Sequence, residues 1–142
     1  MNLGFTGGAH GEELMAEYIS GLTMSMFVLD YDHNALTPKL LEETHGRMFW
    51  KVRERNPGLP ILLMSRPKYC LTPEDEQRLR VVHNTYLSAK AMGDENVYFL
   101  SGPELMELAG DNGTVDNCHP SDSGYLSMSV AFGRVLEEIW KR

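Results

Sequence analysis

Met26-Phe27-Val28-Leu29-Asp30-Tyr31 is an unbroken apolar run that closes on an acidic and an aromatic residue. Two similar runs follow, at Ile61–Ser65 and Val97–Leu100. Strands that are buried on both faces have such continuous runs, and they are typical of parallel sheets covered by helices on both sides. The three runs therefore predict a buried parallel sheet, and we expect Met1–Phe5 to be the end of a fourth strand.

Amphipathic helices are predicted between these runs, starting with Leu14–Leu22. The next two are expected to begin at Thr37-Pro38 and Thr72-Pro73, because Thr is a favoured N-cap and Pro fits the first helical turn. A short helical turn starts at Pro103, and the last helix carries an apolar stripe from Met128 to Ile139. The alternation of strands and helices predicts an α/β fold with right-handed crossovers, in one domain over residues 1–142.

The composition excludes several classes of function. The chain has 142 residues with 13 Lys and Arg against 20 Asp and Glu, a formal net charge of −7. This balance gives no basic surface to replace the counterions of nucleic acid, so no nucleic-acid partner is expected. No stretch approaches the ~20 apolar residues of a membrane span. The first residues do not resemble a signal peptide, so we expect a cytoplasmic protein, with an upstream transport signal as the alternative. Two cysteines, Cys70 and Cys118, are expected to be free thiols.

Asp116 and His119 stand three residues apart in a turn-rich segment before the last helix. A carboxylate at this spacing can bind one imidazole nitrogen and leave the other free to act as a base. The alternative is a solvated His beside a turn Asp.

Other polar residues follow the predicted strands. Asn34 lies where it can donate its amide hydrogens to an oxyanion, although an Asn that caps the next turn is an equal alternative. Asp30, Asp32 and His33 match a set of metal ligands only loosely, and no metal site is predicted. The glycine turn at Thr6–His10 can approach a ligand, but its spacing is not that of a dinucleotide-binding loop. A phosphate, nucleotide or flavin binder is therefore a weaker interpretation.

Taken together, these segments resemble the SGNH (GDSL-type) esterases and lipases. The similarity rests on Asn2–Gly7, on Asn34 after a strand, and on Asp116-x-x-His119-Pro120 before the last helix, and it covers nearly the whole chain. Asn34 is the looser match, because Asp32 stands where the family has Gly. The resemblance implies a flavodoxin-like three-layer α/β/α fold, no cofactor, and small-molecule ester substrates. It also implies that His119 is the general base, Asp116 its orienting partner, and Gly7 and Asn34 the oxyanion-hole donors. If the resemblance holds, a hydrogen bond of roughly 2.6–3.2 Å joins the Asp116 carboxylate to a ring nitrogen of His119.

The family's nucleophile is the Ser of a Gly-Asp-Ser block after its first strand, and these 142 residues contain no such block. The resemblance therefore implies a domain without its first strand, first helix and nucleophile, and hence an inactive chain. Ser65 and Ser101 stand at strand ends, but we expect them to bind loop backbone rather than to replace the nucleophile. A non-catalytic binding or scaffold domain on the same fold is the alternative function. Because the strand at Met26–Tyr31 then lacks a neighbour, we also expect a homodimer.

Overall fold

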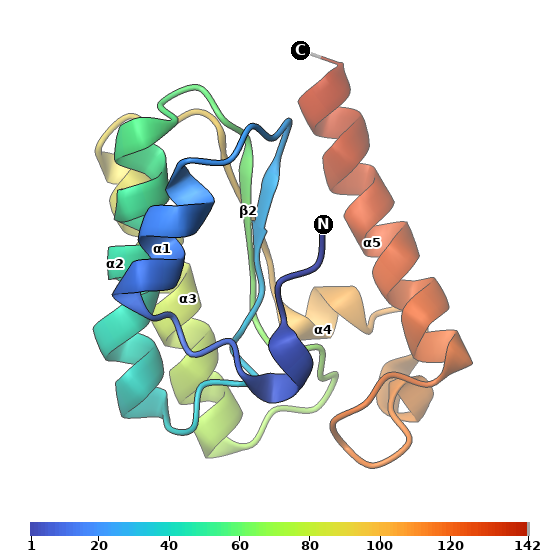
Figure 1. The fold of residues 1–142 in the computed structure, drawn as a ribbon. Helices are drawn as coiled ribbons and strands as arrows, with labels where there is room; N and C mark the ends of the chain where they lie inside the picture. Colours follow the sequence, from blue (N-terminus) through green and yellow to red (C-terminus); the bar gives the residue numbers. More distant parts are fainter. Residues whose placement is uncertain (142) are drawn as a thin grey trace.

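The computed structural model describes residues 1–141, in which strands and helices alternate (Figure 1). The elements in chain order are the 3-10 turn η1 (Phe5–Gly7), α1 (Glu13–Ser20), β1 (Phe27–Leu29), α2 (Pro38–Arg55), β2 (Ile61–Met64), α3 (Pro73–Ala91), β3 (Val97–Leu100), α4 (Gly102–Leu105), the 3-10 turn η2 (Gly110–Gly113) and α5 (Asp122–Trp140). The strands form a parallel sheet in the order β1-β2-β3, with Phe27 beside Ile61 and Ile61 beside Val97. All three predicted apolar runs are therefore confirmed as strands of a parallel sheet.

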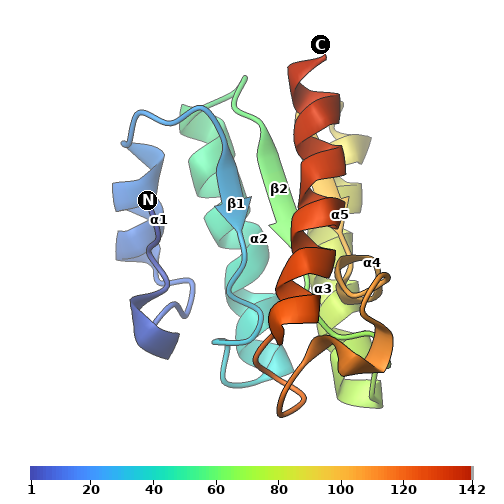
Figure 2. The same cartoon turned by 90° about the vertical axis from the view of Figure 1, so that its right-hand side faces the viewer.

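The sheet lies between two layers of helices. Helices α1, α2 and α3 cover one face and α4 and α5 cover the other (Figures 1 and 2). Successive side chains of a strand point to opposite faces, so Ile61 and Leu63 of β2 enter the core under α2 and α3, whereas Leu62 and Met64 enter the core under α5. Every residue of β2 is buried, which explains its unbroken apolar sequence. This arrangement is the predicted three-layer α/β/α fold.

The helix starts follow the predicted capping pattern. The Thr37 hydroxyl accepts a hydrogen bond from the backbone N–H of Leu40 at 3.1 Å, and Pro38 is the first residue of α2. Thr72 and Asp75 form a reciprocal capping box at the start of α3. Helix α5 begins at Asp122, capped by Ser121, well before the apolar stripe from which it was predicted. Within the described residues no helix is both long and apolar enough to span a membrane.

The prediction of a strand at Met1–Phe5 is wrong. Residues 1–4 have no regular structure, and the chain then enters η1, where Phe5, Thr6 and Gly7 all have positive φ angles of 47°, 51° and 87°. An extended segment becomes a strand only where a neighbouring strand pairs with it, and β1 pairs with β2 alone. The outer edge of β1 is consequently open.

Candidate active site

Asp116 and His119 lie in a tight turn between η2 and α5. An isolated antiparallel bridge joins Thr114 to Pro120, and the backbone N–H of Val115 donates to the carbonyl of His119 at 2.9 Å. Asn117 at the tip has a left-handed φ of 64°, a conformation that Asn adopts more readily than most residues. These local bonds present both side chains on one side of a short hairpin.

The Asp116 carboxylate binds His119 twice. One oxygen, Oδ2, lies 2.7 Å from Nδ1 of the imidazole, which confirms the predicted hydrogen bond. The other, Oδ1, accepts the backbone N–H groups of His119 at 2.7 Å and Cys118 at 3.0 Å. These bonds, first those from His119, lower the pKa of Asp116 to about 2, so the carboxylate is ionised at neutral pH. An ionised acceptor favours the tautomer with the proton on Nδ1 and leaves Nε2 as the basic nitrogen.

This pair is open to solvent, since the His119 side chain is 75% exposed and the Asp116 side chain 51% exposed. Its position in the fold is set by helix packing. Gly124 in the first turn of α5 lies against the backbone of Gly113, so close that a Cβ atom on Gly124 would stand 1.9 Å from the Gly113 carbonyl oxygen. The start of α5 is thereby seated on η2, and the turn between them is held at the carboxyl end of the sheet (Figure 2).

Asn34 follows β1 at the same end of the sheet. Its backbone N–H donates to the carbonyl of Tyr31 at 2.9 Å, and no hydrogen bond among residues 1–141 engages its side-chain amide. The neighbouring His33 contacts the turn directly, because its Nδ1 lies 3.7 Å from Sγ of Cys118. The structure therefore brings the segments of Asn34 and His119 together. That the two side chains line one cleft stays a prediction.

Gly7 lies farther from this pair. The η1 turn is at the carboxyl end of the sheet, but on the opposite side of β1 from the Asp116–His119 turn (Figure 2). Gly7 is exposed, and no atom lies within 4 Å of the position that a Cβ would take. Its proposed role as an oxyanion donor stays a prediction.

The two strand-end serines have structural partners. The buried Ser65 hydroxyl accepts the backbone N–H of Gly102 at 2.8 Å. Ser101 caps α4, accepting from the N–H of Glu104 at 3.3 Å and donating to the Glu104 carboxylate. Both serines bind backbone near the loops, as the sequence predicted.

A buried ionic cluster, which the sequence analysis missed, supports the strand ends. Asp32 accepts the backbone N–H of Arg66 at 2.9 Å and lies 3.3 Å from Nη1 of Arg78, which also donates to the Asp32 carbonyl at 3.0 Å. The cluster extends to Asp75, whose carboxylate oxygens lie 3.0 Å from Nη1 of Arg66 and 2.8 Å from Nζ of Lys68. Burial opposes ionisation of Asp75, but hydrogen bonds from Lys68 and Thr72 outweigh it and hold its pKa well below the ordinary value. The cluster ties the ends of β1 and β2 to the start of α3, and so fixes the segment that carries Asn34.

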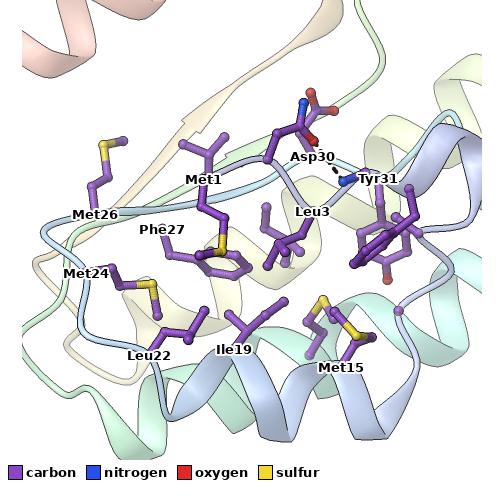
Figure 3. Close-up of a pocket in the computed structure, with 18 of the residues that line it drawn as sticks. Met1, Leu3, Met15, Ile19, Leu22, Met24, Met26, Phe27, Asp30 and Tyr31 are labelled. Carbon is purple, nitrogen blue, oxygen red and sulfur yellow. Dashed lines mark hydrogen bonds between the residues drawn. The ribbon is translucent and has the colours of Figure 1, made fainter.

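A pocket of about 840 Å³ lies elsewhere, at the open edge of β1 (Figure 3). Its walls are Met1–Phe5, the α1 residues Met15 and Ile19, and the segment from Leu22 through Tyr31. Asn34, Asp116 and His119 do not line it. The pocket is therefore separate from the candidate site.

The three-layer α/β/α fold and the position of the Asp116–His119 pair are now established, and they can be compared with known proteins. Residues 1–137 match the model of the GDSL-like lipase/acylhydrolase family, and the chain belongs to this family. No curated protein sequence was found to match the chain.

Several solved structures share the fold, and three of them are described here. A putative GDSL-like lipase from Bacteroides ovatus is 20% identical, with a TM-score of 0.79 over 95% of this chain and 42% of its own. The salicylyl-acyltransferase SsfX3 of a tetracycline biosynthetic pathway is 19% identical, with a TM-score of 0.74 over 93% of this chain and 42% of its own. A family two carbohydrate esterase from Clostridium thermocellum is 17% identical, with a TM-score of 0.68 over 93% of this chain and 44% of its own. The chain thus spans less than half the length of these structures.

Proposed function

We propose that this chain carries the base and the oxyanion-binding groups of a hydrolase site for small-molecule esters. The observation that carries the proposal is the 2.7 Å hydrogen bond between Asp116 Oδ2 and His119 Nδ1 at the carboxyl end of the sheet. Membership of the acylhydrolase family supports it. The similar structures are those of a GDSL-like lipase, an acyltransferase and a carbohydrate esterase, and these three activities all act on acyl groups.

In this proposal His119 Nε2 takes the proton of a serine hydroxyl while the serine Oγ attacks the ester carbonyl carbon. Asp116 stabilises the imidazolium that forms. The Asn34 side-chain amide and the Gly7 backbone N–H stabilise the negative charge on the carbonyl oxygen. The proton then passes to the leaving alcohol oxygen, and water hydrolyses the acyl-serine in a second round that again uses His119. None of these steps requires a cofactor.

The serine itself is missing from the described site. Among residues 1–141 no serine hydroxyl is hydrogen-bonded to His119, and these 142 residues contain no Gly-Asp-Ser block. We therefore expect the chain alone to be inactive. A non-catalytic binding or scaffold domain on the same fold is the second candidate function.

The experiment compares the 142-residue chain with a version extended at its N-terminus by a family-type strand and helix that include a Gly-Asp-Ser block. The present chain should show negligible turnover of p-nitrophenyl acetate and no fluorophosphonate label. The extended version should gain both. Replacing His119 by Ala in the extended version should lower turnover by roughly four orders of magnitude or more, since members of a triad act as a unit.

His83→Gln on α3 is the matched control, because it removes another imidazole remote from the turn and should leave turnover unchanged. A folded extended version that gains neither turnover nor label would favour the scaffold function. Strong labelling of the present chain at Ser65 or Ser101 would contradict the roles assigned to those serines.

A further inference from the structure

One side-chain contact links the turn that carries Asp116 and His119 to the segment after β1. Among residues 1–141, the other hydrogen bonds of residues 114–120 stay within residues 115–119. The contact that leaves the turn joins Sγ of Cys118 to Nδ1 of His33, at 3.7 Å. The turn is thus closed on itself and tied to the strand ends through a thiol and an imidazole.

The hairpin meets the rest of the fold at two places. At its base Gly113 lies against Gly124 of α5, and beside its tip Cys118 contacts His33. A short hairpin that is held only at its base can swing as one body, because its internal bonds do not change when it does. The contact beside the tip is therefore the one that fixes the direction in which the hairpin points.

His33 is a firm anchor for this contact. It is half-buried and follows Asp32, whose side chain is 0% exposed and accepts the backbone N–H of Arg66 at 2.9 Å. On its other side, the N–H of Asn34 donates to the carbonyl of Tyr31 at 2.9 Å. The backbone is consequently held both before and after His33.

The His33 ring is uncharged at neutral pH. Burial has the largest effect and lowers its pKa below the ordinary value. Four charged side chains also act on this pKa, which Arg66 and Lys68 lower and Asp32 and Asp75 raise. A neutral imidazole has one N–H and one bare nitrogen, and a thiol can donate or accept. A hydrogen bond between Nδ1 of His33 and Sγ of Cys118 can therefore form with either tautomer.

We propose that His33 is a positioning residue, which places the acid–base turn beside the segment of Asn34 through its hydrogen bond with Cys118. Cys118 directly precedes His119 and His33 directly precedes Asn34, and consecutive Cα atoms are about 3.8 Å apart. The contact thus joins the immediate neighbours of the base and the oxyanion donor, roles that rest on the proposed function. Their separation matters because a displacement of about 1 Å can slow a reaction about 100-fold.

The first test measures the contact in the 142-residue chain, with histidine labelled with 15N and at about pH 8, where neutral rings dominate. Cys118→Ala should change the 15N shift of Nδ1 of His33. Cys118→Ser keeps a hydrogen-bonding group in place of the thiol and should retain most of the parent value. His119 should keep its Nδ1 proton in all three proteins, because its bond with Asp116 is internal to the turn. The signals of His83, on α3, should stay unchanged and serve as the control.

The second test measures the swing of the hairpin by backbone 15N relaxation of residues 114–119. Order parameters should be near the ~0.85 of rigid backbone in the parent and in Cys118→Ser, and lower in Cys118→Ala. His33→Leu should act like Cys118→Ala. His33→Asn keeps a donor and an acceptor near the position of Nδ1 and should act like Cys118→Ser. If the Ala and Ser variants of Cys118 give the same shifts and order parameters, whether unchanged or both changed, the proposal is overturned.

The role in the reaction is measured in the extended version described above. Cys118→Ala should lower its kcat about tenfold or more and leave KM within about threefold, because His33 and Cys118 position the base without touching the substrate. Cys118→Ser should recover most of the lost kcat. A folded extended version without turnover would contradict the proposed function alone, and the NMR tests would still decide the link between His33 and Cys118. An active extended version whose kcat is insensitive to Cys118→Ala would overturn the positioning role.

Discussion

Asp116 holds His119 at two points, with Oδ2 2.7 Å from the ring nitrogen Nδ1 and Oδ1 2.7 Å from the backbone nitrogen. A single carboxylate therefore fixes both the path of the backbone and the orientation of the ring. Because Asp116 and His119 are only three residues apart, both contacts are formed within the turn itself.

Acid titration should release this turn at an unusually low pH. Hydrogen bonds to the carboxylate lower the pKa of Asp116 from 3.8 to about 2. A lowered folded-state pKa means that the stabilisation is fully present above about pH 4 and is lost as the pH falls through about 2. The amide NMR shifts of Cys118 and His119 should therefore titrate with a midpoint near 2, while the β2 amide of Leu62 monitors the fold. A midpoint near 4 would contradict the hydrogen-bonded geometry.

Two glycines of α5 should respond oppositely to alanine. Gly124→Ala places a Cβ 1.9 Å from the Gly113 carbonyl oxygen, so the turn must shift, and we expect a loss of about 1–3 kcal/mol in the free energy of unfolding. Gly133→Ala adds a methyl group where no atom lies within 4 Å, and should stabilise the helix by about 0.5–1 kcal/mol. Urea denaturation measures both. Equal effects of the two substitutions would show that the contact between Gly113 and Gly124 is absent.

The buried Asp32–Arg78 pair should be far more sensitive than a surface pair. The Arg78 side chain is 3% exposed and the Asp32 side chain 0% exposed, so Arg78→Met leaves a buried carboxylate with fewer partners. We expect a loss of about 3–5 kcal/mol, nearer the lower figure because Arg66 remains. Arg134→Met removes an exposed ion pair with Glu107 and should cost less than about 1 kcal/mol. Chemical denaturation of the two variants in parallel distinguishes them.

Asp30 should make the protein less stable as the pH rises. Asp30 is an exposed residue on the wall of the pocket, although many protein atoms lie in the neighbourhood of its carboxyl group. This burial, with a smaller effect of the nearby Asp32 charge, raises its pKa from 3.8 to about 6. A raised folded-state pKa favours the protonated form, so stability falls as the pH increases from about 4 through 6.

The substitution Asp30→Asn removes this titration. The variant should have a higher Tm than the parent protein at pH 7.5 and nearly the same Tm at pH 4.5. Glu12 is a second acidic residue that lines the pocket, so it is kept unchanged in both proteins that are compared. Parallel Tm curves for the two proteins across this range would refute the assignment.

Local signals in the sequence predicted most of the fold. The strands at Ile61 and Val97 were recognisable because burial on both faces leaves an unbroken apolar run, and the starts of α2 and α3 because Thr-Pro pairs cap helices. The prediction at Met1–Phe5 failed because strand formation depends on a neighbour, which a local pattern does not report.

In the candidate site, too, the local contacts were predictable from the sequence and the long-range contacts were not. The bond between Asp116 and His119 was predictable, since three residues of turn determine it. The partnership of Asp32 with Arg78 joins residues 46 apart, and the contact of His33 with Cys118 joins residues 85 apart. Buried charges signal that partners exist, but one sequence does not identify which ones. The distance from Gly7 to the pair likewise depends on how β1 and η1 are placed in space.

The bridge between Thr114 and Pro120 closes a short hairpin, and this hairpin contains both Asp116 and His119. The hydrogen bonds of Asp116 and His119 are closed within the hairpin, and the hairpin meets the rest of the protein at the contact of Gly113 with Gly124 and of Cys118 with His33. Residues 113–124 therefore form a local unit in which the geometry of the carboxylate and the imidazole is set by bonds between near neighbours in the sequence.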